Sequence, residues 1–172
     1  MIKHLYDPEL KRFIKGIYPN GEKDTTIDSS VSTVFAYEVL DAKDGRVKNT
    51  MDALSKELWV KTEVGGLARY QNDHYRRVSL DTPGNPWFIS TLRLARWHIA
   101  IASSLDELAS AMDFLKWAAK NALPSGALAE QLDPYSGKPI SATPLLWSHA
   151  EFVIAVCEYI NKYQEITANI ST

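Results

Sequence analysis

The chain has 172 residues, of which 45% are apolar, and its formal net charge at pH 7 is -2. This length and composition predict a single domain, residues 1–172, with a buried core, and the near-neutral charge excludes a general nucleic-acid binder. The single cysteine, Cys157, excludes an internal disulfide framework. Because no apolar stretch resembles a signal peptide or a membrane span, we expect a soluble cytoplasmic protein without membrane contact.

Helical periodicity dominates the first half of the chain, where three helices are predicted. The first is short, at 8–16. The second covers 29–40 with Asp28 as its N-cap, and the third covers 45–58 with Asp44 as its N-cap. The apolar residues of the third helix recur every three or four positions and form one stripe, Val47, Met51, Leu54 and Leu58.

Three longer helices are predicted in the second half, at 86–102, 105–121 and 144–163. The first and the last begin with an N-cap residue followed by a proline, Asn85–Pro86 and Thr143–Pro144, and proline is favoured at the first helical position. Apolar residues occur on several sides of 86–102, so we expect this helix to be buried on more than one side.

Two long segments without helical periodicity separate these helices, at about 59–84 and 122–143. Irregular loops of this length are uncommon in compact domains unless they are functional or disordered, and their arginine and aromatic residues are not typical of disorder. No convincing strand pattern occurs, and 63–70 is the best candidate for a short β-hairpin. The alternation of helix pairs and long loops indicates an all-α protein like a toroid of paired helices.

Two groups of loop residues are candidates for chemistry. Glu130 lies near glycine and proline in the second loop, where partial burial would tune a carboxylate as a general base, and the alternative is a solvated glutamate. In the first loop Arg69 offers a fork of donors and Tyr70 a flat ring, which suits the hydroxyls and the C–H face of a sugar. The alternative for Arg69 is a surface ion pair with Asp73.

Trp87 and Trp147 each follow a predicted helix start, where an aromatic ring can line the mouth of a helical array or pack into the core. The histidines lack metal-ligand spacing, and His98, among apolar neighbours, is typical of a core histidine. The paired glycines at 65–66 are too weak a signal for a phosphate-binding loop. We therefore expect neither a metal nor a cofactor.

Three segments occur in an order that resembles glycoside hydrolase family 15: "GGLARYQNDHY", "GNPWFISTLRLA" and "LPSGALAEQLDPYSGKPISATPLLWSHAEF". This family includes the glucoamylases, the glucodextranases and some trehalases. The resemblance implies an all-α helical toroid, the (α/α)₆ barrel. In that comparison the chain resembles the C-terminal half of the catalytic domain, with about three of the six helix pairs and with long loops at the sugar-binding end.

The resemblance also implies inverting hydrolysis of terminal α-glucosidic bonds, in which one carboxylic acid protonates the leaving oxygen and a second carboxylate activates water. The water-activating glutamate of the family's Gly-x-x-x-Glu-Gln segment corresponds to Glu130. The sugar-binding arginine corresponds to Arg69 and the acidic residue after it to Asp73. Two tryptophans of the family's sugar site correspond to Trp87 and Trp147, and the expected ligand is an α-glucan or an α-glucoside.

The family's catalytic acid has no counterpart in residues 1–172. One interpretation is a hydrolase part that is inactive alone and needs a separately encoded N-terminal half. A second is a non-catalytic remnant, an oligomeric saccharide-binding or structural helical protein, and a third is an unrelated helical interaction protein. A partial barrel should also expose an apolar surface for a partner half or for self-association. The residues expected on that surface are Trp87, Phe88, Trp97, Phe114 and Trp147.

Overall fold

The computed structural model describes residues 2–170, and its regular structure is mainly helical. The helices are α1 (Ile2–Leu5), α2 (Thr33–Ala36), α3 (Gly45–Leu58), α4 (Phe88–Ile101), α5 (Leu105–Lys120) and α6 (Leu146–Ile170), and a 3-10 turn, η1 (Ser29–Ser32), precedes α2. Short strands in this range pair antiparallel: β1 (Tyr6–Asp7) with β2 (Arg12–Phe13), β3 (Gly16–Ile17) with β4 (Lys23–Asp24), and β5 (Leu67–Ala68) with β6 (Pro86–Trp87).

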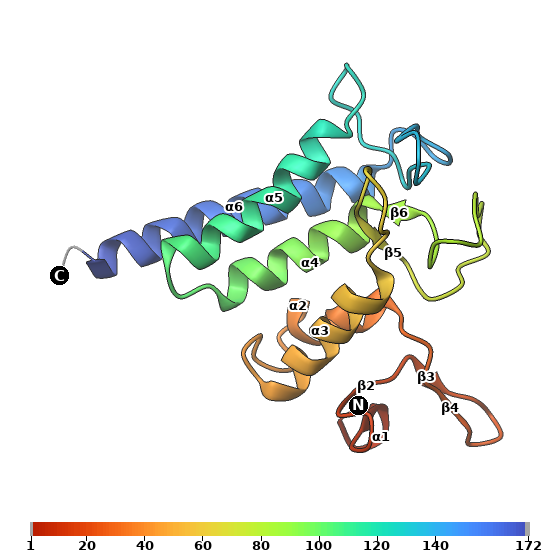
Figure 1. Cartoon of the computed structure of the whole chain (residues 1–172). Helices are drawn as coiled ribbons and strands as arrows, with labels where there is room; N and C mark the ends of the chain where they lie inside the picture. Colours follow the sequence, from red (N-terminus) through yellow and green to blue (C-terminus); the bar gives the residue numbers. More distant parts are fainter. Residues whose placement is uncertain (1, 171–172) are drawn as a thin grey trace.

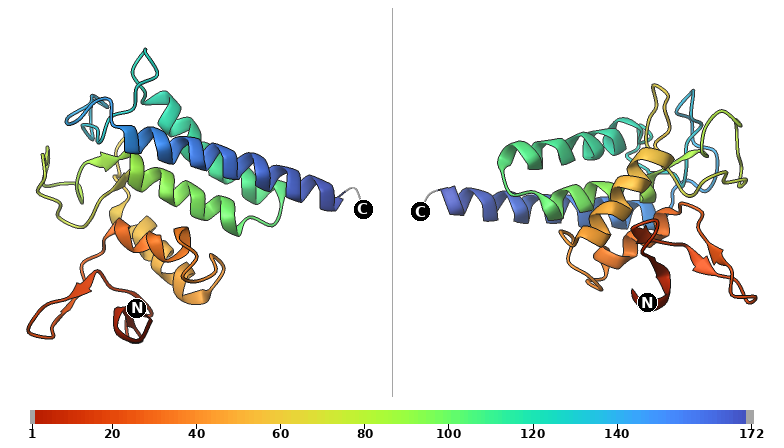
Figure 2. Two further views of the ribbon diagram at one scale, coloured as in Figure 1. Left: turned by 180° about the vertical axis from the view of Figure 1, so that it is seen from behind. Right: turned by 60° about the horizontal axis from the view of Figure 1, so that its bottom comes forward.

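Helix α4 lies at the centre of the fold. It packs against both α5 and α6, which also contact each other, and α2 and α3 contact it from another side (Figure 1). The two further views in Figure 2 show the same arrangement, with the N-terminal hairpins away from α5 and α6. Phe88 and Leu92 of α4 are fully buried, and each such burial contributes about 1.5–3 kcal/mol. The predicted burial of this helix on more than one side is confirmed.

Helix α3 has the bounds that the sequence predicts. The carboxylate of Asp44 accepts a hydrogen bond from the backbone N–H of Arg46 at 2.8 Å and so caps the helix. Hydrogen bonds from the side chain and the backbone of Arg46 lower the pKa of Asp44 to about 2, which keeps the cap ionised at neutral pH. All four residues of the predicted apolar stripe are buried: Val47, Met51, Leu54 and Leu58.

The predicted helix at 8–16 is wrong, because the side chain of Asp7 takes the first backbone donors of this segment. Asp7 Oδ1 accepts hydrogen bonds from the backbone N–H groups of Glu9 and Leu10 at 2.9 and 3.0 Å. Lys11 then has a left-handed φ of 54°, and the chain returns as β2 to pair with β1. The hydrogen bonds from the backbone to the Asp7 side chain thus stabilise a turn in place of the short helix that the apolar pattern predicts.

The predicted helix at 29–40 is shorter than expected. Asp28 caps it, since its carboxylate accepts a hydrogen bond from the backbone N–H of Ser30 at 2.9 Å. The helix starts as the 3-10 turn η1, however, and α2 ends at Ala36. Glu38 has a left-handed φ of 56°, a conformation that does not continue a right-handed helix.

The expected helix start at Asn85–Pro86 is also wrong, because Pro86 and Trp87 belong to β6 and α4 begins at Phe88. Asn85 connects the two long loops instead of capping α4. Its side-chain amide donates a hydrogen bond to Gln131 Oε1 at 2.8 Å, and both side chains are buried. Helix-capping rules consider only neighbouring residues, so they do not predict a hydrogen-bond partner that is this distant in the sequence.

Helix α6 begins at Leu146, later than the predicted Thr143–Pro144 start, and it extends to Ile170, beyond the predicted end at residue 163. Thr143 does not cap it, because its hydroxyl donates to the backbone carbonyl of Ser141 at 3.1 Å.

The two long loops are present as predicted. No helix occurs from residue 59 to 87 or from 121 to 145. The hairpin expected within 63–70 is not formed, because β5 pairs with β6 and Leu67 also forms a bridge with Trp59. The first loop is thereby attached to the segment that leads into α4.

Helix α6 is apolar on two opposite sides. One side packs on α4 and α5. The other leaves large apolar residues exposed: Leu146, Trp147, Val153, Ile154 and Ile160. An exposed apolar surface therefore exists, as the sequence led us to expect, but it lies on α6. Among the described residues no helix has both the length and the apolar character of a membrane span.

The expected membership of that surface is wrong except for Trp147. Trp87, Phe88 and Trp97 are buried, and the Trp97 indole N–H donates to a backbone carbonyl at 3.1 Å. Phe114 is partly buried and stacks on His98 with ring centres 5.2 Å apart. Burial lowers the pKa of His98, as is usual for a histidine packed among apolar groups.

Gly66 allows the first loop to pass closely against Trp117. Its φ is 91°, and a Cβ there would lie 2.5 Å from Trp117 Cζ2 and 2.9 Å from Pro86 Cβ. Gly66→Ala should therefore lower the free energy of unfolding by about 2–4 kcal/mol, since it combines backbone strain with overpacking. Gly126→Ala is the control: its φ is 81°, but no atom lies within 4 Å of the added Cβ. Strain alone should cost about 1–2 kcal/mol there, and equal losses in urea denaturation would contradict the role of the contact.

Candidate functional site

The loops gather at one end of α4 and α6, near β5 and β6 (Figure 1). The segment around Asp28 lies beside the segment around Tyr70, because these two residues form an antiparallel bridge and the backbone N–H of Ser29 donates to the carbonyl of Arg69 at 2.7 Å. Arg69 directly follows β5, which pairs with β6. Backbone hydrogen bonds thus fix this part of the first loop next to the start of α4.

Arg69 has a carboxylate behind it and aromatic rings around it. Its Nε and Nη2 atoms each donate to a carboxylate oxygen of Asp73 at 2.8 Å, and Asp73 is only 1% exposed. The guanidinium carbon lies 4.5 Å from the centre of the Trp87 ring and 4.9 Å from that of Tyr70. The ion pair considered in the sequence analysis is formed, but its carboxylate is buried, so it is not the surface pair of the alternative interpretation.

The charge of Arg69 is well supported. Burial lowers the pKa of its guanidinium, but the hydrogen bonds and the charge of Asp73 outweigh burial and raise the pKa above its ordinary value. The side chain is still 34% exposed. Arg69 is therefore a fixed cation that remains accessible to a ligand.

Four of the predicted sugar-site residues line one cavity of about 390 Å³: Arg69, Tyr70, Trp87 and Trp147. Asp73 supports Arg69 from behind. The other lining residues are Lys15, Asp28, Ser29, Ser30, Ile89, Ser90 and Arg93. The volume falls in the range of small-molecule sites, about 300–1,000 Å³, and the mixture of rings and polar groups suits a ligand with both apolar faces and oxygen atoms.

Glu130 does not line this cavity. It is half-buried, and its Oε2 accepts a hydrogen bond from the hydroxyl of Ser141 at 2.6 Å. Its backbone carbonyl accepts from the N–H of Phe88 at 3.3 Å, and the next residue, Gln131, forms an antiparallel bridge with Trp87. The second loop is thus attached to β6 beside the cavity, while the carboxylate of Glu130 is held by a neighbour in its own loop.

Three charged residues of the cavity were not selected from the sequence. Arg93 had a usable signal, because it is an arginine whose helical neighbours Leu92, Leu94 and Ala95 are apolar. No sequence pattern links Lys15 with Asp28, since these two residues belong to different N-terminal segments. The fold places Lys15 Nζ 3.6 Å from Asp28 Oδ2.

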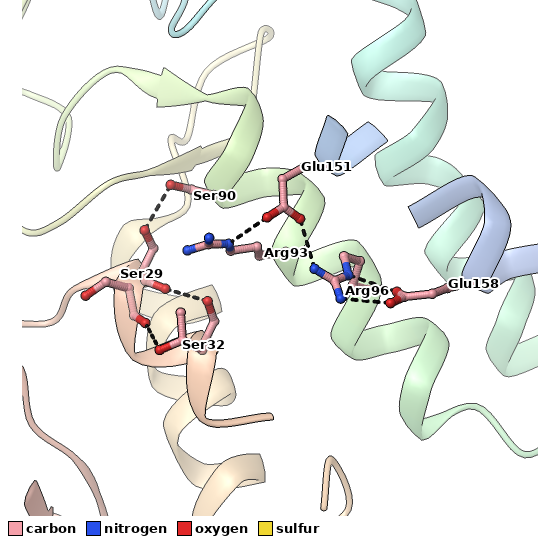
Figure 3. A network of polar contacts seen from close by, with 9 residues as sticks. Ser29, Ser32, Ser90, Arg93, Arg96, Glu151 and Glu158 are labelled. Atoms are coloured by element: carbon pink, nitrogen blue, oxygen red, sulfur yellow. Dashed lines mark hydrogen bonds and ion pairs between the residues drawn. The ribbon is translucent and has the colours of Figure 1, made fainter. Parts of the chain in front are cut away.

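Alternating charges connect the cavity to the contact between α4 and α6 (Figure 3). Glu151 accepts hydrogen bonds from Arg93 Nε at 3.2 Å and from Arg96 Nη1 at 3.0 Å. Arg96 also donates to both carboxylate oxygens of Glu158, at 2.9 and 2.8 Å. Arg96 and Glu158 line a second, larger cavity of about 770 Å³, which contains none of the predicted site residues.

Figure 3 also shows how η1 is attached to α4 near Arg93. The hydroxyl groups of Ser29 and Ser90 lie 2.9 Å apart and share a hydrogen bond. The hydroxyl of Ser32 donates to the carbonyl of Ser29 at 2.6 Å. These buried contacts fix the wall of the cavity opposite to α6.

Comparison with known proteins identifies the relatives of this chain. The model of glycosyl hydrolases family 15 matches residues 98–157. An uncharacterized glycosyl hydrolase of Methanocaldococcus jannaschii is 33% identical over 166 residues, which cover 91% of this chain and 25% of the relative. A trehalase of Mycobacterium tuberculosis is 25% identical over 151 residues, covering 88% of this chain and 21% of that enzyme. The chain thus spans about a quarter of the length of these relatives.

A solved structure supports the same relationship. A bacterial glucoamylase in complex with acarbose superposes with a TM-score of 0.69 and 27% identity, over 87% of this chain and 23% of the glucoamylase chain. The predicted fold, part of an (α/α)₆ helical toroid, is confirmed. The family model, the archaeal glycosyl hydrolase and the glucoamylase structure together show that this is a glycoside hydrolase family 15-like chain.

Proposed function

We propose that this chain supplies the sugar-binding residues and the general base of a site for inverting hydrolysis of α-glucosidic bonds, with an α-glucan or an α-glucoside as the ligand. The observation that carries the proposal is the setting of Arg69. Its guanidinium is fixed by the buried Asp73 and lies beside the rings of Tyr70 and Trp87, in one cavity with Trp147. A sugar offers hydroxyl oxygens to the guanidinium and C–H faces to the rings.

Glu130 is the proposed general base. A base of this kind takes a proton from water while the water oxygen attacks the anomeric carbon on the side opposite to the leaving oxygen. The hydrogen bond from Ser141 to Oε2 orients the Glu130 carboxylate. Its attachment beside β6 keeps the second loop next to Trp87.

The leaving oxygen needs a proton from a separate acid. Asp28, a carboxylate in the wall of the cavity, already has other partners: it caps η1 by accepting a hydrogen bond from the backbone N–H of Ser30, and it lies 3.6 Å from the Lys15 ammonium. We therefore assign the acid to another part of the hydrolase and expect no turnover by residues 1–172 alone.

The proposal includes a protein partner at α6. The exposed apolar side of this helix, with Leu146, Val153 and Ile160 among its residues, suits the remaining helices of an (α/α)₆ domain or a second copy of the chain. Apolar helix surfaces of this kind are usually covered in the functional assembly.

Saccharide binding without catalysis is the second candidate function. It is favoured by one observation: Glu130 lies outside the lining of the cavity and is bonded to Ser141. The two functions differ in a maltose assay performed with the remaining helices supplied. Turnover supports the hydrolase, and binding without turnover supports the non-catalytic protein.

Arg69→Ala should weaken the binding of maltose by about 10-fold or more, because a hydrogen bond to a charged group contributes about 1.5–3 kcal/mol. An NMR chemical-shift titration of the chain with maltose measures this. Arg46→Ala is the matched control, since Arg46 makes the same two-bond contact with a carboxylate, that of Asp44, but lies outside the cavity. Equal affinities of Arg69→Ala and the unmodified chain would remove the basis of the proposed function.

A further inference from the structure

We infer that Arg93 is a second saccharide-binding residue of the cavity, with Glu151 as its positioning residue. This inference rests on the sugar-binding function proposed for Arg69. It adds a hydroxyl-binding group from a different element, α4, on another wall of the same cavity.

Arg93 and Arg69 are supported in the same manner. Each donates from Nε to a buried carboxylate: Arg69 to Asp73 at 2.8 Å and Arg93 to Glu151 at 3.2 Å. Each guanidinium also lies over an aromatic ring, 4.5 Å from the centre of Trp87 for Arg69 and 5.3 Å from that of Trp147 for Arg93. Two arginines that are fixed in this way lose little conformational freedom when a ligand binds.

The terminal nitrogens of Arg93 are the atoms available to a ligand. The side chain is buried, with only 7% of the residue exposed, and Nη1 and Nη2 make no hydrogen bond to any residue in the described range 2–170. Figure 3 shows the guanidinium of Arg93 between Glu151 and the Ser29–Ser90 pair, and Arg93 and both serines line the cavity. Neither terminal nitrogen is among the fully buried side-chain atoms without a hydrogen-bond partner in residues 2–170, so both keep some contact with solvent, and the acceptors open to them are water or the hydroxyl oxygens of a bound saccharide.

The surrounding charges favour a neutral ligand. Cations and anions alternate along a series of ion pairs that runs from Arg93 to Glu151, Arg96 and Glu158. The series holds two cations and two anions, so its charges balance. The charge of Arg69 is likewise balanced by Asp73. With both arginines compensated, a carboxylate or phosphate on the ligand would gain little from them, while neutral hydroxyl groups find directed donors. A neutral saccharide is therefore the class of ligand that fits.

The test is an NMR titration of the chain with maltose, using Arg93→Gln and Arg93→Lys. Arg93→Gln should weaken maltose binding by about 10-fold. Arg93→Lys should also bind more weakly than the unmodified chain, because it keeps the charge but loses the planar fork of donors. Arg46→Gln is the control: Arg46 also donates from Nε to a carboxylate, that of Asp44, but lies outside the lining of this cavity, so affinity should stay within about 2-fold.

Glu151→Gln tests the positioning role in combination with Arg93→Gln. It should weaken binding about 3- to 10-fold in the unmodified chain and have no further effect when Arg93 is already glutamine. A general structural role would weaken binding in both backgrounds. Unchanged maltose affinity in Arg93→Gln, together with a loss in Arg69→Ala, overturns this inference alone. Absence of maltose binding by the unmodified chain overturns the proposed function and the inference together.

Discussion

Glu130→Gln should lower kcat for the hydrolysis of maltose by about 10²-fold or more, because a general base contributes about 10²–10⁴-fold to the rate. The measurement requires a complete site. We would replace the matching region of the bacterial glucoamylase, to which this chain is 27% identical, by residues 1–172 and compare the hybrid with its Glu130→Gln form. KM should change by less than about 3-fold, since the lost interaction belongs to the transition state.

Glu63→Gln in the same hybrid is the control for this loss, because Glu63 is an exposed glutamate in the other long loop. It should leave kcat and KM nearly unchanged. If Glu130→Gln also retained kcat, Glu130 would be an ordinary loop carboxylate bonded to Ser141, and the hydrolytic proposal would be abandoned in favour of saccharide binding.

Phe88→Ala should lower the free energy of unfolding by about 3–5 kcal/mol, the cost of removing a fully buried ring. Phe88 is 0% exposed, lies 5.1 Å from the Trp117 ring centre to centre, and begins α4 directly after the cavity residue Trp87. Because domains are stable by only about 5–15 kcal/mol, this substitution should leave a marginal fold. Urea denaturation followed by tryptophan fluorescence measures the loss.

Two further variants make this measurement decisive. Phe88→Leu keeps most of the apolar volume and should cost about 1–2 kcal/mol, so it gives a value even if Phe88→Ala does not fold. Leu80→Ala removes an apolar side chain that is 83% exposed in the first loop and should change stability by less than about 0.5 kcal/mol. A loss below about 1 kcal/mol for Phe88→Ala would contradict the central place of this residue in the core.

The sequence predicted best the elements whose determinants are local. Helix α3 has its cap, Asp44, and its apolar stripe within one short segment, and its bounds are correct. The segment at 8–16 failed although it is equally short, because a single side chain, that of Asp7, offered the backbone other hydrogen bonds. The start of α4 failed for a non-local reason: Asn85 bonds with Gln131, far along the chain.

The candidate site shows the same division. The arginine, the tyrosine and the acidic residue of the first loop are close in sequence, and the contact between Arg69 and Asp73 could be considered from their spacing alone. The contact between Trp147 and Arg93 could not be predicted from the sequence, since it depends on how α6 packs on α4. Glu130 likewise lies outside the cavity lining and accepts a hydrogen bond from Ser141, and no local pattern indicates either fact.

The alternating charges of Arg93, Glu151, Arg96 and Glu158 have a consequence for ionic strength. Dissolved salt weakens the long-range fields of unbalanced charges over a Debye length of about 8 Å at physiological concentration. Here Glu151 and Arg96 each have an oppositely charged neighbour on both sides. The nitrogen–oxygen distances along the series are 3.2, 3.0 and 2.8 Å, and the net charge of the four residues is zero. Such a compact array projects little field into solution, so a neutral sugar would enter this cavity by shape and hydrogen bonding, equally well in dilute and in concentrated salt.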